Sequence, residues 1–282
     1  MVQKRINLTP YLFILPAVFL IFMFKVYPIL SSLIESFIHN GRLSLRAYNR
    51  VFNDLSFWSS LWVTIKLNLV LIPVQVSIGL IIALLVNVNI KGMGFFRTIF
   101  YLPVTISLTV ATLLWNLMLE PNSGVINSFI GIFGIPRQGF LVDRNQALWS
   151  IVVICIWKGV GYLMMFFLAG LKNIDSGIYE SVKIDGAGWF STLFRITLPL
   201  IKRVILFVFV LDTMANVLLF VPIQLITRGG PEGSTNVLMM EAYRSIFMFN
   251  DRSRGAVIFT VLIFLIAIIC VLQFKLLNEK DE

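Results

Sequence analysis

Charged residues are scarce in this chain of 282 residues: they make up 13% of it, whereas 58% of it is hydrophobic. A soluble domain usually carries about a quarter charged residues. The charges are also unevenly spread, because charge-poor blocks alternate with polar ones along the sequence. This pattern excludes an ordinary soluble globular domain and is typical of several membrane spans.

Residues that carry catalytic or metal chemistry are equally rare. The chain has one histidine and two cysteines, and their spacing does not suit a metal site. Cys155 and Cys270 each lie deep in an apolar run, so we interpret them as small apolar residues rather than as a disulfide. The sequence holds no G-x-x-x-x-G-K-S/T phosphate loop and no evident nucleophile–base pair. We therefore expect no catalytic residues, no metal site and no cofactor in this chain itself.

Long apolar runs are what the sequence has instead. A helix of about 20 apolar residues crosses the hydrocarbon core of a membrane, and a helix satisfies its backbone groups within the segment. Runs long enough to span cover residues 10–34, 60–86, 98–119, 147–170, 203–227 and 256–277. The sequence predicts an all-α integral membrane protein with six transmembrane helices. We expect one domain over residues 1–282, located in the cell membrane (plasma or inner membrane) as a multi-pass protein.

The net charge of +9 fits this interpretation. Many basic residues lie beside the ends of the apolar runs, where they set topology and meet anionic lipid headgroups. We therefore expect membrane lipid, and no nucleic acid, as the partner of these charges. Lys25 and Lys66 lie within apolar runs, and a long stem can carry their ammonium groups to the headgroups. An even number of spans places both termini on one side.

A polar segment between the fourth and fifth apolar runs has the features of two short helices. Asp175 can cap a helix over residues 176–185, because its carboxylate accepts backbone N–H groups that lack helical partners. Gly186 can adopt the left-handed conformation that ends this helix. A second helix is predicted at 188–197, and Pro199 is expected to end it. On these grounds alone the segment could also be a solvated amphipathic loop on the headgroups.

The spacing within this segment is more specific. From Glu180, Gly186 lies six positions on, Ile196 sixteen and Pro199 nineteen. This spacing resembles the cytoplasmic EAA loop in the membrane subunits of binding-protein-dependent ATP-binding cassette (ABC) importers. The resemblance implies a type I ABC importer permease fold, with both termini cytoplasmic and a coupling loop over residues 172–202. It implies that a separate ATPase docks on this loop through Tyr179, Glu180, Asp185, Gly186, Ala187 and Pro199.

The resemblance covers most of the chain but departs from the family at two positions, since the family's Glu-Ala-Ala is Glu180-Ser181-Val182 here. It includes Trp157-Lys158-Gly159-Val160-Gly161-Tyr162 ahead of the loop. Thr227-Arg228-Gly229-Gly230-Pro231, after the fifth run, resembles a motif of the sugar and glycerol-phosphate branch. What this implies is a permease subunit that passes a carbohydrate, with an oligosaccharide as the expected form, and that hydrolyses no ATP itself.

The same resemblance implies the partners of the chain. They are a second homologous permease subunit, two ATP-binding cassette ATPase subunits and an extracytoplasmic solute-binding protein. ATP and Mg are then bound by the ATPase subunits, so this chain needs neither as its own cofactor.

Polar residues inside the apolar runs predict a path for the ligand. Tyr162 lies four residues after Lys158, and Asn216 four after Asp212, so each pair shares one helix face. Charged groups in a membrane core are costly and tend to face a cavity or a partner. The resemblance implies that these four residues, with Gly159, line the substrate path. An ion pair between Lys158 and Asp212 that only joins two helices is an equally open interpretation.

Two further functions remain open. The same type of importer could carry glycerol phosphate or an acidic oligosaccharide, because Lys158 suits an anion. A self-sufficient secondary transporter could instead use Lys158 and Asp212 as ion-coupling groups. That transporter would need no ATPase, so co-purification with an ATPase separates the two classes.

Overall fold

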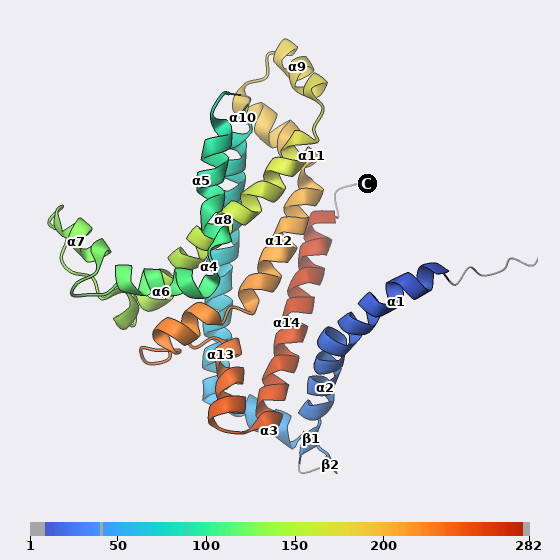
Figure 1. Cartoon of the computed structure of the whole chain (residues 1–282), viewed down its shortest axis with the longest axis vertical. Coiled ribbons are helices and arrows are strands. Elements are labelled where there is room, and N and C mark those ends of the chain that lie inside the picture. Colours follow the sequence, from blue (N-terminus) through green and yellow to red (C-terminus); the bar gives the residue numbers. More distant parts are fainter. Residues whose placement is uncertain (1–8, 40–41, 89, 279–282) are drawn as a thin grey trace, which may run out of the picture. The chain divides into compact units, whose positions relative to one another are not determined.

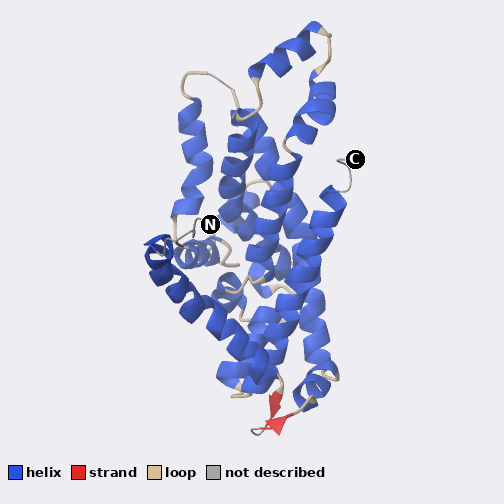
Figure 2. Cartoon of the chain, turned by 90° about the vertical axis from the view of Figure 1, so that its right-hand side faces the viewer, coloured by secondary structure: helices blue, strands red, loops and turns tan. Residues whose placement is uncertain are grey.

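The computed structural model describes residues 9–39, 42–88 and 90–278. Among these residues helices dominate, and the β-structure is confined to one short hairpin (Figure 1, Figure 2). The chain divides into two compact units. Unit 1 comprises Met1–Asp54 and Ala242–Val261, and unit 2 comprises Leu55–Glu241 and Leu262–Glu282.

Unit 1 combines an N-terminal helical span with a hairpin and short helices. In chain order its described elements are α1 (Thr9–Ile21), the π-helix η1 (Phe22–Val26), α2 (Tyr27–Ser36), β1 (Ile38–His39), β2 (Arg42–Leu43), α3 (Arg46–Phe52), the π-helix η5 (Arg244–Met248) and the first part of α14 (Arg252–Asn278). The two strands, drawn red in Figure 2, pair antiparallel with Ile38 opposite Leu43.

Ion pairs tie the two sequence segments of unit 1 together. The Arg50 guanidinium lies 2.9 Å from the Asp251 carboxylate, and Arg254 lies 2.7 Å from Asp54. The Ser253 hydroxyl also donates to the Ile38 carbonyl, at 3.0 Å. Polar contacts therefore hold the residues after the first span against the start of α14.

Unit 2 contains the long packed helices and the connections between them. Its described elements are α4 (Leu55–Val86), α5 (Met93–Thr105), α6 (Leu108–Met118), α7 (Val125–Gly131), the 3-10 helix η2 (Phe140–Val142), α8 (Ala147–Lys172), α9 (Ser176–Ile184), α10 (Trp189–Thr192), the π-helix η3 (Leu193–Thr197), α11 (Leu198–Leu200), α12 (Lys202–Val217), the π-helix η4 (Ile223–Thr227), most of α13 (Leu238–Tyr243) and the rest of α14.

The core of unit 2 forms where α4 packs along α8, with α12 against both (Figure 1). Apolar side chains from these helices interlock there, and Phe167 and Met164 are completely buried. The cluster consists of Ile72, Val76, Ala83, Val86, Leu163, Met164, Phe167, Leu168, Leu171, Ile201 and Val208. Helix α5 also packs on α8. Helix α8 is therefore the element around which the functional residues are arranged.

Four of the described helical segments are long and apolar enough to cross a membrane: Leu12–Ser36, Leu55–Val86, Ala147–Lys172 and Arg252–Lys275. They confirm four of the six predicted spans. The predicted span at 98–119 is not one straight helix, because α5 and α6 meet at 95°. The break has a local cause: Ser107 is extended and caps α6, its hydroxyl accepting the Val110 N–H at 3.2 Å.

The predicted span at 203–227 is also interrupted. Helix α12 ends at Val217 after 16 residues, and the chain becomes helical again near Pro222, which precedes η4. A proline fits the start of a helix because its missing N–H has no helical acceptor there. The fold class is nonetheless confirmed: this is an all-α membrane protein. The cytoplasmic placement of the termini stays a prediction, and residues 1–8 and 279–282 lie outside the described residues.

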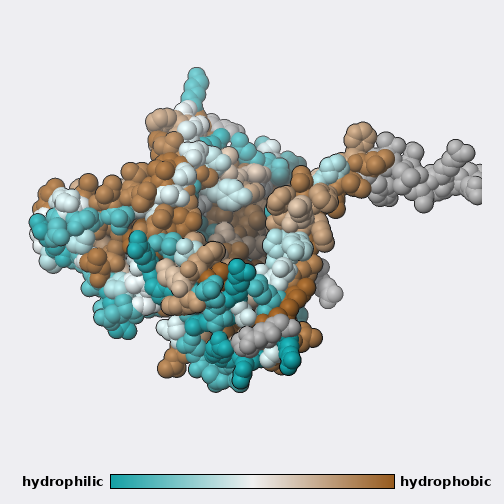
Figure 3. All heavy atoms as spheres, turned by 60° about the horizontal axis from the view of Figure 1, so that its bottom comes forward, coloured by the Kyte–Doolittle hydropathy of each residue, from teal (hydrophilic) through white to brown (hydrophobic). Residues whose placement is uncertain are grey.

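Apolar side chains cover broad parts of the surface, as the brown areas of Figure 3 show. On α4 alone, Leu69, Ile81 and Leu85 are more than half exposed. A water-soluble protein rarely presents contiguous apolar surface on this scale. The exposed helix faces therefore suit a hydrocarbon environment.

Candidate functional site: the coupling loop and the polar face of the helix core

The first half of the predicted coupling loop folds as the sequence predicts. Asp175 caps α9, with its carboxylate accepting the Gly177 N–H at 3.0 Å. The helix ends at Gly186, which has φ +71. The Ala187 N–H then returns to the Val182 carbonyl at 3.2 Å, which closes the last turn. The cap and the glycine stop fix a short helix at the end of unit 2 where α8 ends (Figure 1).

The second half differs from the prediction of a helix over 188–197 ended by Pro199. Helix α10 continues through η3 into α11, so that Pro199 lies inside a helical stretch that breaks at Ile201. A proline ring clashes with the carbonyl four residues earlier in a regular α-helix. Here the turns ahead of Pro199 are π-helical and therefore wider. The widened backbone accommodates the ring, which is why Pro199 does not stop the helix.

The outer surface of the loop is apolar and carries acidic residues. Ile184 is 85% exposed, Trp189 64% and Phe190 71%. The rings of Trp189 and Phe190 pack edge to face at 4.8 Å, so they form one exposed aromatic pair. Glu180 and Asp185 of the same loop are also exposed. Aromatic anchors with nearby charges are the composition of a protein-binding surface.

Tyr179 and Ala187 are half-buried. Both line a cavity of about 480 Å³ between the loop and the ends of α4 and α8. The Tyr179 hydroxyl lies 3.3 Å from the Thr197 hydroxyl, which joins the two halves of the loop. Tyr179 therefore supports the loop from inside, whereas Phe190 lies on its outer surface and Trp189 both lines the cavity and is exposed to solvent.

Lys158 has a different partner from the one expected in a helix-joining ion pair. Its ammonium donates to the Val104 carbonyl at 3.0 Å, and within the described residues it makes no ion pair with Asp212. Val104 lies in the last turn of α5, where carbonyls lack helical partners and the helix end is negative. Lys158 therefore caps α5 at the bend. The interpretation that Lys158 and Asp212 form an ion pair joining two helices is wrong.

Asp212 and Asn216 lie together, as their spacing predicts. Both are buried, and one Asp212 carboxylate oxygen accepts the Asn216 amide at 2.9 Å. The second oxygen, Oδ2, is buried and has no hydrogen-bond partner among the described residues. Tyr162 on α8 is 44% exposed and packs edge to face on Phe166 at 4.8 Å.

Gln75 is a residue that the sequence reasoning missed. It lies on α4, is 3% exposed, and its Oε1 has no partner among the described residues. A methyl group at Gly159 would collide with its side-chain amide, so the Gln75 amide lies directly against α8 at Gly159. The available signal was an amide within an otherwise apolar run. Together, Gln75, Asp212 and Asn216 are called the polar face below.

The polar face can accept hydrogen bonds from a ligand or from water. Buried acceptors are costly when they lack donors, and most buried polar groups find one. Asp212 Oδ2 and Gln75 Oε1 can each accept a hydrogen bond from a hydroxyl group or from water. The helices that carry them, α12 and α4, both pack against α8.

Comparisons with known proteins agree with this geometry. Residues 75–281 match the family described as "Binding-protein-dependent transport system inner membrane component". The chain is 34% identical to the lactose transport system permease protein LacF of Rhizobium radiobacter, over 99% of this chain and 97% of that protein. It is 30% identical to the sn-glycerol-3-phosphate transport system permease protein UgpA of Salmonella typhimurium (strain LT2), over 96% and 94% respectively.

Solved structures share the fold. A bacterial ABC transporter involved in the import of the acidic polysaccharide alginate has a chain with TM-score 0.88 and 22% identity, covering 97% of this chain and 96% of that one. A second structure, of a bacterial alginate ABC transporter in complex with an alginate pentasaccharide-bound periplasmic protein, has a chain with TM-score 0.86 and 23% identity, covering 95% and 93%. At these identities the likeness shows the fold alone. The predicted membrane location is confirmed, since the family and the apolar helices both indicate a multi-pass inner-membrane protein.

Proposed function

This chain belongs to the family of binding-protein-dependent transport system inner membrane components, and we propose that it is the permease subunit of an ABC importer for carbohydrate. In this role it passes a sugar, with an oligosaccharide as the expected form, from an extracytoplasmic solute-binding protein into the cytoplasm. ATP hydrolysis belongs to two separate ATPase subunits, and a second homologous permease completes the path.

The observation that carries this proposal is the exposed surface of the coupling loop. Ile184, Trp189 and Phe190 present apolar area to solvent, and the same loop exposes the carboxylates of Glu180 and Asp185. Burying such a surface against a protein gains free energy in proportion to the apolar area removed from water. An ATPase that docks there could move α8 and α12, because the loop connects these two helices directly.

The choice of carbohydrate draws support from the relatives and from the polar face. LacF is a lactose transport permease and the two neighbouring structures belong to alginate transporters. The unpartnered acceptors of Gln75 and Asp212 suit a ligand rich in hydroxyl groups. In the proposal Tyr162, Asn216 and Gly159 line the same path, and Lys158 holds the bend of α5 beside it.

Glycerol phosphate is the second candidate ligand, because UgpA is a glycerol-3-phosphate permease of similar identity. Lys158 is the cation among the residues of the proposed path, and its ammonium is already bonded to the Val104 carbonyl rather than free to meet a phosphate. An uncharged sugar is therefore favoured over glycerol phosphate and over an acidic sugar.

Reconstitution tests the proposed function. The full chain is placed in proteoliposomes with the second permease, the ATPases and the solute-binding protein, and uptake of labelled lactose, alginate oligosaccharide and glycerol phosphate is compared. ATP-dependent sugar uptake is expected. Glu180→Lys should abolish it, whereas Lys91→Gln, a charge removal in another exposed loop, should not.

Two outcomes would contradict the proposal. Uptake that persists without ATPase subunits would identify a secondary transporter. ATP-dependent uptake of glycerol phosphate with no sugar uptake would keep the importer and replace its ligand.

A further inference from the structure

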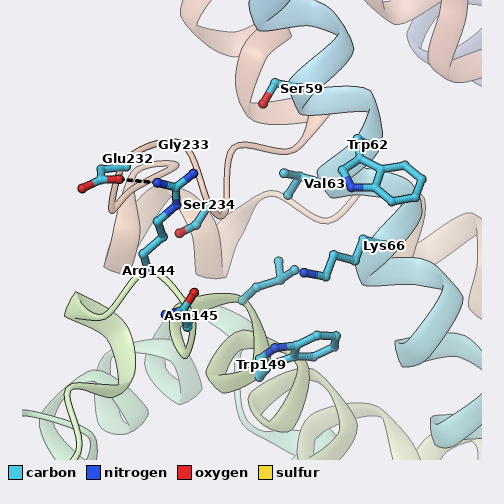
Figure 4. A pocket seen from close by; sticks show the side chains of 11 residues that line it. Ser59, Trp62, Val63, Lys66, Arg144, Asn145, Trp149, Glu232, Gly233 and Ser234 are labelled. Carbon is cyan, nitrogen blue, oxygen red and sulfur yellow. Dashed lines mark hydrogen bonds and ion pairs between the residues drawn. The ribbon is translucent and has the colours of Figure 1, made fainter.

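A second pocket in unit 2 lies at the opposite end of α8 from the coupling loop. It has a volume of about 380 Å³ and is formed by the first turns of α4 and α8 with the turn at 232–234 (Figure 4). We call it the outer pocket. The residues that line it include Trp62, Lys66, Arg144, Trp149, Glu232 and Ser234.

The turn at 232–234 is fixed on α4 by hydrogen bonds just beyond it. The Asn236 amide donates to the Ser60 hydroxyl at 2.9 Å, and the Leu238 N–H donates to the Thr64 hydroxyl at 2.8 Å. Ser60 and Thr64 lie on the helix that carries Trp62 and Lys66. One side of the outer pocket is therefore held in place by buried polar contacts of its own.

The outer pocket has an excess of positive charge. Two cations, Lys66 and Arg144, line it together with one carboxylate, Glu232. The Arg144 guanidinium and the Glu232 carboxylate pair at 2.7 Å, so this carboxylate is already engaged. Lys66 lies 5.3 Å from the centre of the Trp149 ring and makes no hydrogen bond or ion pair with any described residue. The Lys66 ammonium can therefore bind an anion that enters the outer pocket.

Apolar rings flank this charge. Trp62 is 65% exposed and Trp149 38%, and Figure 4 shows Lys66 between them. Lys66 lies four residues after Trp62, so both occupy one face of α4. An anion that carries apolar groups next to its charge would therefore contact both Lys66 and the flanking rings.

The outer pocket lies away from the proposed ligand path. Trp149 precedes Lys158 by nine residues on α8, which is about two and a half turns, so the two side chains leave opposite faces of the helix. Trp149 is also in the first turn of α8, at the end away from the coupling loop. Tryptophan rings gather at the depth of lipid headgroups in membrane proteins.

We propose that the outer pocket binds the phosphate group of a phospholipid in the outer leaflet. Lys66 contacts the phosphate as a point charge, and Arg144 lies at the rim, where its remaining N–H groups reach the same anion. The rings of Trp62 and Trp149 pack on the glycerol and the first acyl carbons. Ser234, whose hydroxyl is buried without a partner among the described residues, can donate to a headgroup oxygen. This site does not depend on the transported ligand.

Native mass spectrometry of the full chain, purified with its partner subunits, tests the site with phosphatidylglycerol as the probe. Lys66→Met should weaken binding of one phosphatidylglycerol molecule about tenfold, the effect of losing roughly 1.4 kcal/mol of a charge-assisted contact. Lys66→Arg should retain most of the binding. Lys25→Met is the matched control, since Lys25 is also exposed on a spanning segment but lies outside the outer pocket.

Two results would overturn the proposal. One is equal phosphatidylglycerol binding by the wild type, Lys66→Met and Lys25→Met. The other is displacement of the bound lipid by millimolar glycerol phosphate, which would make a water-soluble phosphate ester the occupant. If Lys66→Met does not assemble, Trp149→Leu gives the same comparison with the charge intact.

Discussion

The coupling loop and the polar face are both parts of unit 2, yet different forces build them. The loop takes its shape from residues close in sequence: Asp175 caps α9, and Gly186 ends it eleven positions later. The polar face consists of side chains from different helices, including Gln75 on α4 and Asp212 on α12. Only tertiary packing brings these two helices together. Changes to the loop should therefore act through local backbone geometry, and changes to the polar face through partners left unpaired.

The largest effect is expected at the glycine turn. Gly186 has φ +71, a region where an L-residue costs about 1–2 kcal/mol and a β-branched residue more. Gly186→Val should strain the turn and disorder the outer surface of the loop, and transport of sugar in reconstituted vesicles should fall to background. The affinity of the solute-binding protein for the sugar should be unchanged.

Gly188 provides the matched control for this change. Its φ of −71 is open to every residue, and no atom lies near the position of an added methyl group. Gly188→Ala should retain nearly full transport. Equal losses in Gly186→Val and Gly188→Ala would show that any side chain in the loop is harmful, and the role of the turn would be refuted.

A smaller loss is expected on the polar face. Asn216→Ala removes the amide that Asp212 accepts at 2.9 Å and leaves the whole carboxylate without a protein partner. A buried unsatisfied group costs about 1–3 kcal/mol of stability, and the proposed path also loses a lining amide, so transport should fall about tenfold while the assembly still forms. Met214→Leu, at an exposed position on the same helix, should have little effect. Normal transport by Asn216→Ala would remove this residue from the path.

Lys158 should affect stability more than transport. Its bond to the Val104 carbonyl is a hydrogen bond of a charged group, worth about 1.5–3 kcal/mol, and it holds the end of α5 at the bend. Lys158→Met should lower the melting temperature of the purified assembly by several degrees. Because Lys158 and Asp212 do not pair, the double-mutant cycle of Lys158→Met and Asp212→Asn should give a coupling energy near zero. A coupling above about 1 kcal/mol would restore the ion pair.

The sequence was most informative where a single residue determines the backbone. The cap at Asp175 and the stop at Gly186 need no knowledge of the rest of the chain, and both are confirmed. The family resemblance is confirmed as well, and the apolar runs predicted four spans correctly. The ATPase-docking role of Tyr179, Glu180, Asp185, Gly186, Ala187 and Pro199, and the single domain over residues 1–282, stay predictions.

The failures occurred where packing or a weak local signal decided the structure. The bend between α5 and α6 falls inside a continuous apolar run, so hydropathy could not reveal it. The sequence left open whether Lys158 meets the ligand or pairs with Asp212. Its actual partner, the carbonyl of Val104, is free only because α5 ends at that bend. Gln75 looked like one amide among apolar residues until α8 was packed against it through Gly159.

The smallest effect is expected at a second locally built turn, residues 120–123. The Glu120 carboxylate accepts the backbone N–H groups of Ser123 and of Asn122, the latter at 2.8 Å, and these bonds hold the pKa of Glu120 below its usual value. The folded pKa is lowered, so the carboxylate stabilises the turn above its ordinary pKa of about 4.3. That stabilisation is lost as the pH falls through the folded value. Hydrogen exchange at the Ser123 amide, corrected for its intrinsic rate, should therefore quicken as the pH falls below the ordinary carboxyl pKa. Glu120→Gln should remove this pH dependence.

The Ala187 amide is the control, because it bonds to the main-chain carbonyl of Val182 and needs no carboxylate. If both amides responded alike, the pH effect would be global, and the local account of the Glu120 turn would fail.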